Sequence, residues 1–149
     1  MQITKIVCCI DFSDSSNNAF KTAVDMAKLH GASLDLIHVR EPIINPLLVS
    51  GAGGLPPDAI HATLAEIEQA MTEKYLASMD PEVPCRVVVR DGHPSTEIID
   101  YLNEVQADLA VVGSRGLSGM GLVLFGSVSR RVAHKAPCNV LVSRRRRQP

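Results

Sequence analysis

Three glycines in the second half of the chain are spaced as expected for a phosphate site. Gly113 comes directly after Leu109 to Val112, an apolar run typical of a buried strand, and Gly116 follows three residues later. Gly126 immediately precedes Ser127, where a helix is predicted to begin. Glycine lets the backbone approach a bound group closely, and a helix start offers unpaired N–H groups and a positive dipole end. The spacing therefore predicts an anion site, most simply for the phosphates of a nucleotide.

An ordinary flexible connection between a strand and a helix is the alternative, because Gly119 and Gly121 enrich the same loop in glycine. Two common phosphate loops do not fit. The segment lacks the Gly-Lys-Ser/Thr of a Walker A loop, and Gly119-x-Gly121 lacks the third glycine of a dinucleotide fingerprint. The hydroxyls of Ser127 and Ser129 at the predicted helix start favour the phosphate site over the plain loop.

Apolar runs along the chain alternate between strand and helix patterns. Strands are predicted at 3–10, 33–39, 84–90, 109–112 and 139–143, and helices from Ser13 or Asp14 to Gly31, over 58–79, from Pro94, and over 127–136. This alternation predicts an α/β fold with a parallel sheet and right-handed crossovers. Open sheets of this kind bind ligands at the carboxyl ends of their strands, where the strand order reverses.

Length and composition predict one domain and limit its expected partners and cellular location. The chain has 149 residues, 46% of them hydrophobic, so a single domain over 1–149 with one real core is expected. A net charge of −1 makes nucleic acid an unlikely partner. The four cysteines show no Cys-x-x-Cys spacing, and no apolar run approaches the length of a membrane span. A cytoplasmic protein without membrane, metal or disulfide framework is expected.

The pattern Gly-x2-Gly-x9-Gly-Ser, complete from Gly113 through Ser127, resembles the nucleotide-binding signature of the universal stress protein family. The resemblance extends along nearly the whole chain, including Asp11 after the first predicted strand and Gly92-His-Pro94 after the third. It implies an open five-stranded parallel sheet in the order 3-2-1-4-5, with helices on both faces, of the Rossmann-like, adenine nucleotide alpha-hydrolase-like class. The strand order then reverses between the first and fourth strands, which places Asp11 beside Gly113.

The resemblance also implies which residues contact a nucleotide. Cys9, Ile10, Asp11 and Val39 are expected at the base and ribose, Val112, Gly113, Arg115 and Gly116 at the ribose and phosphates, and Gly126, Ser127, Val128 and Ser129 at the phosphate tail. A turn or helix-cap role is the alternative for Asp11, and a solvated loop charge is the alternative for Arg115. The histidines are dispersed, and His38 within a strand is expected to be structural, so no catalytic residue and no metal ligand is predicted.

The function implied is that of an ATP-binding, dimeric, cytoplasmic regulator or sensor of the stress response, with ATP bound with or without Mg²⁺. The dimer is expected to pair through the last strand, and an unidentified protein partner is expected. Two alternatives stay open: a dimeric protein-interaction module without nucleotide, and a slow ATPase. The loop over 42–57 is interpreted as a lid, a packing surface or variable surface, and Arg144 to Arg147 as a solvated tail or a grip for phosphate or an acidic partner.

Overall fold

The computed structural model describes residues 1–42, 63–115 and 126–145. Within these ranges one parallel sheet contains β1 (Lys5–Cys9), β2 (Ser33–Arg40), β3 (Cys85–Asp91), β4 (Leu109–Gly113) and β5 (Asn139–Ser143). Their order across the sheet is β3-β2-β1-β4-β5, which confirms the predicted order. Because β1 pairs with both β2 and β4, the carboxyl ends of β1 and β4 are where this topology leaves room for a ligand.

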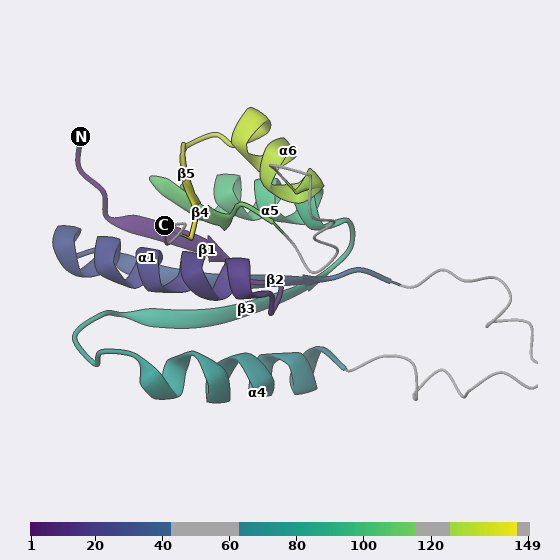
Figure 1. Ribbon diagram of the computed structural model, residues 1–149, viewed down its shortest axis with the longest axis horizontal. Coiled ribbons are helices and arrows are strands. Elements are labelled where there is room, and N and C mark those ends of the chain that lie inside the picture. Colours follow the sequence, from purple (N-terminus) through teal and green to yellow (C-terminus); the bar gives the residue numbers. More distant parts are fainter. Residues whose placement is uncertain (43–62, 116–125, 146–149) are drawn as a thin grey trace, which may run out of the picture.

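Helices cover both faces of the sheet (Figure 1). On one face α1 (Asp14–His30) and α4 (Leu64–Lys74) share a core with the strands, and the short 3-10 helix η1 (Leu76–Ser78) follows α4. On the other face α5 (Pro94–Glu104) and α6 (Ser127–Lys135) build a second core. Central strands are therefore buried on both sides, which is why β4 is apolar along its whole length.

Helix α1 begins and ends where the sequence predicted. The Oγ atom of Ser13 accepts a hydrogen bond from the Ser16 N–H at 3.1 Å, a cap that contributes about 1 kcal/mol. The helix ends at Gly31, whose φ of 64° lies in the left-handed region. Its buried face carries small side chains, including Ala19 and Ala23, so the helix approaches the sheet closely. This close approach fixes the start of α1 beside the carboxyl end of β4.

The single helix predicted over 58–79 is wrong in both its start and its continuity. Thr63 has extended backbone and caps α4, since its side chain accepts from the Glu66 N–H while the Glu66 carboxylate accepts from the Thr63 N–H. The helix stops before Tyr75, and η1 follows as a separate turn. Residues 58–62 lie outside the described residues. The overlooked signal is the capping box, a threonine followed three residues later by glutamate.

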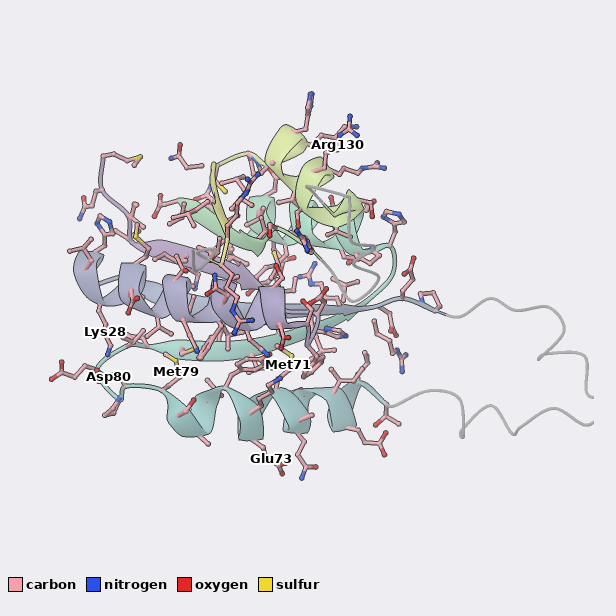
Figure 2. The ribbon with its side chains drawn as sticks, viewed as in Figure 1. Lys28, Met71, Glu73, Met79, Asp80 and Arg130 are labelled. Atoms are coloured by element: carbon pink, nitrogen blue, oxygen red, sulfur yellow. The ribbon has the colours of Figure 1, made fainter. Side chains whose placement is uncertain are left out.

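The two faces of α4 differ as an amphipathic helix requires (Figure 2). Met71 points toward the sheet and is fully buried, whereas Glu73 points into solvent. Beyond the helix, Lys28 near the end of α1 pairs with Asp80 at 2.9 Å. Both side chains of this pair are partly exposed, so its contribution to stability is small. Burial of the Met71 face holds α4 on the sheet.

Three features singled out in the sequence lie outside the described residues: the loop over 43–57, Gly116 of the glycine pattern, and Arg146 and Arg147 of the basic tail. Of the helices within the described ranges, none combines the length and the hydropathy needed to cross a bilayer.

Candidate functional site

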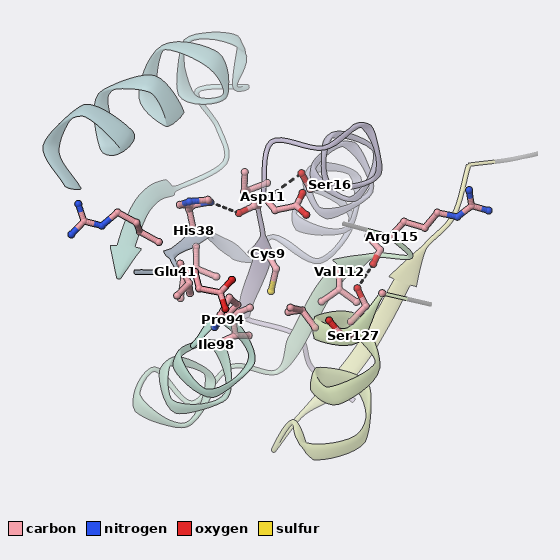
Figure 3. A pocket seen from close by; sticks show the side chains of 18 residues that line it. Cys9, Asp11, Ser16, His38, Glu41, Pro94, Ile98, Val112, Arg115 and Ser127 are labelled. Carbon is pink, nitrogen blue, oxygen red and sulfur yellow. Dashed lines mark hydrogen bonds between the residues drawn. The ribbon is translucent and has the colours of Figure 1, made fainter. Parts of the chain in front are cut away.

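A cleft of about 460 Å³ opens at the carboxyl ends of β1, β2 and β4 (Figure 3). Every predicted site residue except Gly116, which is not among the described residues, lines this cleft. These residues are Cys9, Ile10, Asp11, Val39, Val112, Gly113, Arg115, Gly126, Ser127, Val128 and Ser129. The structure adds lining residues that sequence reasoning missed, namely Ser16, Ile37, His38, Arg40, Glu41, Pro94 and Ile98. The signal that could have found several of them is their position directly after β2 or at the start of α5.

The start of α6 presents unpaired N–H groups to the cleft. Gly126 is the N-cap residue; its own N–H donates to the Ser114 carbonyl at 2.9 Å, and its carbonyl accepts from the Arg130 N–H at 3.0 Å. No side chain of the described residues caps the helix. The main-chain N–H groups of residues 127–129 have no partner among the described residues. With the positive end of the helix dipole, they form a site suited to a phosphate or another anion.

Gly113 is required by packing between α1 and β4. A Cβ atom at this position would lie 2.6 Å from the Oγ atom and 2.8 Å from the main-chain carbon and oxygen of Ser15. The Ser15 hydroxyl in turn accepts from the Arg115 N–H at 3.0 Å. The first turn of α1 is therefore the closest neighbour of Gly113. From the sequence, we had expected this glycine to be needed because a ligand approaches the backbone closely.

The two serines at the start of α6 have different surroundings. Ser129 is buried, and its hydroxyl donates to the Gly113 carbonyl, which ties α6 to the end of β4. Its N–H has no partner among the described residues, and the lone pairs of its oxygen can face a ligand. The Ser127 side chain is exposed, and its hydroxyl has no partner among the described residues. Ser127 is therefore the better placed of the two hydroxyls to donate to an anion.

Asp11 lines the cleft at the end of β1. Its Oδ1 atom accepts from the Ser13 N–H at 3.0 Å and from the Ser13 hydroxyl, and its own N–H donates to the Ser16 hydroxyl at 3.3 Å. These bonds confirm the turn role considered from the sequence. Its Oδ2 atom has no partner within the described ranges. One carboxylate thus fixes the turn into α1 and keeps an oxygen that can accept from a ligand hydroxyl.

The Arg115 guanidinium lies away from the centre of the cleft. Figure 3 shows its side chain extending toward the end of β5, on the side opposite to His38. Arg115 lines the cleft, but its guanidinium is not directed into it. The cleft wall near Ile98, Pro94, Cys9 and Val112 is apolar, which suits the faces of a planar base.

The main chain at the end of β2 also faces the cleft. The Ile10 N–H donates to the Ile37 carbonyl at 2.8 Å, the last bond between β1 and β2. Strand alternation directs the N–H and C=O of Val39 to the same side as those of Ile37, beyond the point where β1 has ended. There the Ile10 carbonyl accepts from Nδ1 of His38 at 2.8 Å. The Val39 groups on this side have no partner among the described residues.

The cysteine in the cleft is not an activated nucleophile. Burial raises the pKa of the Cys9 thiol to about 12, and nearby Cys138 and Asp11 add to the shift. Burial also raises the pKa of the neighbouring Cys8 thiol. Both thiols are protonated at neutral pH and are therefore weak nucleophiles. Over the part of the chain that the structure describes, no three His, Cys, Asp or Glu side chains gather as a metal site.

Comparison with known proteins gives full-length matches. The model of the Universal stress protein family matches residues 2–144. Universal stress protein YxiE of Bacillus subtilis (strain 168) is 31% identical over 145 residues, which cover 94% of this chain and 98% of YxiE. Sequence similarity therefore extends over both the sheet and the cleft.

Solved structures agree with this match. Universal stress protein UspA from Lactobacillus plantarum has a TM-score of 0.80 and 28% identity, covering 97% of this chain and 99% of that protein. A universal stress protein whose crystal structure is a complex with cAMP has a TM-score of 0.62 and 28% identity, covering 97% and 98% of the two chains. The fold of this chain is thus the fold of these proteins.

Proposed function

Because this chain belongs to the universal stress protein family, we propose that it binds an adenine nucleotide in the cleft at the carboxyl ends of β1, β2 and β4. The observation that carries the proposal is the set of main-chain N–H groups at residues 127–129, which have no partner among the described residues and belong to residues that line a cleft with an apolar wall. The cAMP complex of a relative with 28% identity supports adenine as the base.

In the proposed complex the nucleotide extends from the end of β2 to the start of α6. Its phosphates accept from the N–H groups of residues 127–129 and from the Ser127 hydroxyl. A ribose hydroxyl donates to the free Oδ2 atom of Asp11. The base lies at the first and second strands, and the other predicted residues border the ribose and phosphates. These base contacts are Cys9, Ile10 and Val39, and the bordering residues are Val112, Gly113, Arg115, Gly116 and Gly126.

ATP, accompanied by Mg²⁺, is the nucleotide that we propose. Mg²⁺ takes phosphate oxygens and water as ligands, so it needs no dedicated protein site. The Cys9 thiol in the cleft is protonated and is therefore a weak nucleophile. Binding that regulates a protein partner, rather than rapid turnover of ATP, is the role that we propose.

We further propose a two-fold dimer paired through β5. This strand lies at the edge of the sheet, next to β4 alone among the described strands. Its central residues, Val140 to Val142, are only half-buried, so its free edge and apolar side chains suit pairing with a second copy. In this proposal the dimer acts in the cytoplasm, and nucleotide occupancy changes the surface that it presents to a protein partner.

Thermal unfolding with and without Mg-ATP tests the proposed binding. A ligand that binds only the folded state stabilises it by about 2.7 kcal/mol at a hundredfold excess over its Kd. We expect the Tm to rise with Mg-ATP concentration, and to rise less with adenosine, which lacks the phosphates. An unchanged Tm at millimolar Mg-ATP, together with no heat of binding in calorimetry, would contradict the proposal.

A further inference from the structure

His38 occupies a place in the sheet that a main-chain group usually takes. The bonds between β1 and β2 run as far as Cys9 and Ile37, and the Ile10 N–H adds one more at 2.8 Å. The next bond of a parallel ladder would join the Val39 N–H to the Ile10 carbonyl. Instead, Nδ1 of His38 lies 2.8 Å from the Ile10 oxygen. Because a carbonyl oxygen only accepts, Nδ1 carries the proton and donates it.

We propose that His38 is a positioning residue for the nucleotide site, because its bond to the Ile10 carbonyl keeps the Val39 N–H unpaired and available to the bound base. This inference rests on the proposed function. Val39 lines the cleft, and its N–H points toward the β1 side of β2, beyond the end of β1. An amide paired with Ile10 would first have to lose that bond before it could donate to a ligand. With His38 in place, the donor is already free.

The turn that follows Ile10 also contacts the imidazole of His38. Phe12 has a φ of 64°, a conformation that bulky residues rarely adopt. In this conformation its ring lies 5.1 Å from the ring of His38, tilted by 57°. The bond from the Ser13 N–H to Asp11 stabilises the same turn. The packing of the Phe12 ring on His38 thus offsets the backbone strain at Phe12, and it keeps Nδ1 directed at the Ile10 oxygen.

A purely structural role for His38 would give a different pattern of ligand affinities. If the bond only fastened β1 to β2, its removal would lower stability and would weaken every ligand of the cleft alike. If it keeps the Val39 N–H free, its removal weakens those ligands that carry a base. Ribose 5-phosphate, which lacks a base, is therefore the comparison ligand for AMP.

Two substitutions separate these possibilities. His38→Asn retains an N–H donor near the place of Nδ1, and His38→Leu removes the donor at similar volume. Binding of AMP and ribose 5-phosphate is followed by NMR titration of the amide resonances of residues 127–129. For His38→Leu we expect AMP affinity to fall about tenfold, the size of one hydrogen bond, with ribose 5-phosphate changed less than about twofold. For His38→Asn we expect both affinities within about threefold of the unsubstituted protein.

Amide hydrogen exchange at Val39 tests the same claim without any ligand. In the free, unsubstituted protein we expect the Val39 amide to exchange much faster than the Ile37 amide, and to slow when AMP is added. In His38→Leu we expect it to become protected, because the Ile10 carbonyl is then available to it. If His38→Leu does not fold, the first comparison still applies to the unsubstituted protein.

Several results would overturn the inference: a Val39 amide already protected in the free protein, equal AMP affinity in the Asn and Leu variants, or equal losses for AMP and ribose 5-phosphate. Failure of the unsubstituted protein to bind either ligand would instead overturn the proposed function. The exchange of the Val39 amide would then still decide whether His38 keeps that group unpaired.

Discussion

At the amino-terminal ends of the strands the polar side chains around one buried carboxylate pair with one another, whereas at the carboxyl-terminal ends several polar groups have no partner among the described residues. The paired cluster centres on Asp35 of β2, which is 1% exposed. Its carboxylate accepts from Lys5 Nζ at 3.0 Å, from Arg86 Nε at 2.9 Å and from the Tyr101 hydroxyl at 2.8 Å. This cluster joins three strands and α5, and it leaves no carboxylate oxygen for a ligand.

The carboxyl-terminal end of the same sheet is arranged differently. One oxygen of Asp11, the N–H of Val39 and the N–H groups of residues 127–129 have no partner among the described residues, and all of these residues line one cleft. Unpaired polar groups are destabilising when they are kept from water, so their concentration in one place needs an explanation. The amino-terminal end stabilises the fold through these paired groups, and the contrast supports our proposal that the carboxyl-terminal end binds a ligand.

The largest effect on stability is expected for Asp35→Ala. Removal of the carboxylate leaves Lys5, Arg86 and the Tyr101 hydroxyl without their shared acceptor, so we expect a loss of about 3 kcal/mol in the free energy of unfolding. Urea denaturation measures this loss. If the two ends act separately, ATP affinity stays within about threefold of the unsubstituted protein. A large fall in affinity of the folded variant would show that the two ends are coupled.

Gly113→Ala is expected to affect both stability and binding, because α1 packs on Gly113 at the carboxyl end of β4, beside the cleft. The new methyl group would meet Ser15 main-chain atoms at 2.8 Å, so α1 must move, at a cost of about 1–3 kcal/mol. The turn at Asp11 moves with α1, so ATP affinity also falls. Gly31→Ala is the matched control: it introduces strain at a φ of 64° with no atom within 4 Å, and it should lower stability alone.

Acid is expected to weaken the amino-terminal end of the sheet. Burial alone would raise the pKa of Asp35, but hydrogen bonds from Arg86, Tyr101 and Lys5 hold it below its ordinary value. Main-chain N–H groups of Thr4 and Lys5 likewise lower the pKa of Asp108. A lowered pKa in the folded state contributes stability above the unfolded value of about 3.9, and this stability is lost as the pH falls below it.

Urea midpoints measured between neutral pH and pH 3 test this expectation. We expect a plateau near neutral pH and a decline that steepens below about pH 4, the range in which unfolded aspartates take up protons. The decline should be shallower in Asp108→Asn. Stability that increases on acidification through this range would contradict the assignment.

Ser127→Pro is expected to change stability least and to change binding selectively. Proline is tolerated at the first position of a helix, and Gly126 before it has the extended ψ of 153° that a residue preceding proline requires. The substitution removes an N–H that has no partner among the described residues. We expect stability within about 0.5 kcal/mol and ATP affinity lowered about tenfold. Ser127→Ala, which keeps the N–H, is the control and should bind more tightly than Ser127→Pro.

Local patterns were sufficient for most of the fold. Apolar runs interrupted by glycine and proline predicted all five strands, with errors of one or two residues at their ends, as for β1 at Lys5–Cys9 against the predicted 3–10. The strand order came from the family resemblance, because periodicity does not say which strands are neighbours. The start of α4 was missed because the capping box at Thr63 outweighs the apolar spacing that precedes it.

The site was predicted less completely, for a physical reason. The glycine pattern identified the end of β4 and the start of α6, which are close in sequence. The contact between Gly113 and Ser15 and the bond from His38 to Ile10 join residues that lie far apart along the chain. No local spacing encodes such pairs, so the packing role of Gly113 and the freed main chain of Val39 required the structure.

The amide resonances of residues 127–129 provide the most direct test of the central claim. NMR titration should follow them with ATP, with inorganic phosphate and with adenosine, on the same sample. We expect large shifts with ATP, smaller shifts in the same direction with phosphate, and little change with adenosine. Saturable ATP binding that leaves these three amides unmoved, or no binding at all, would contradict it.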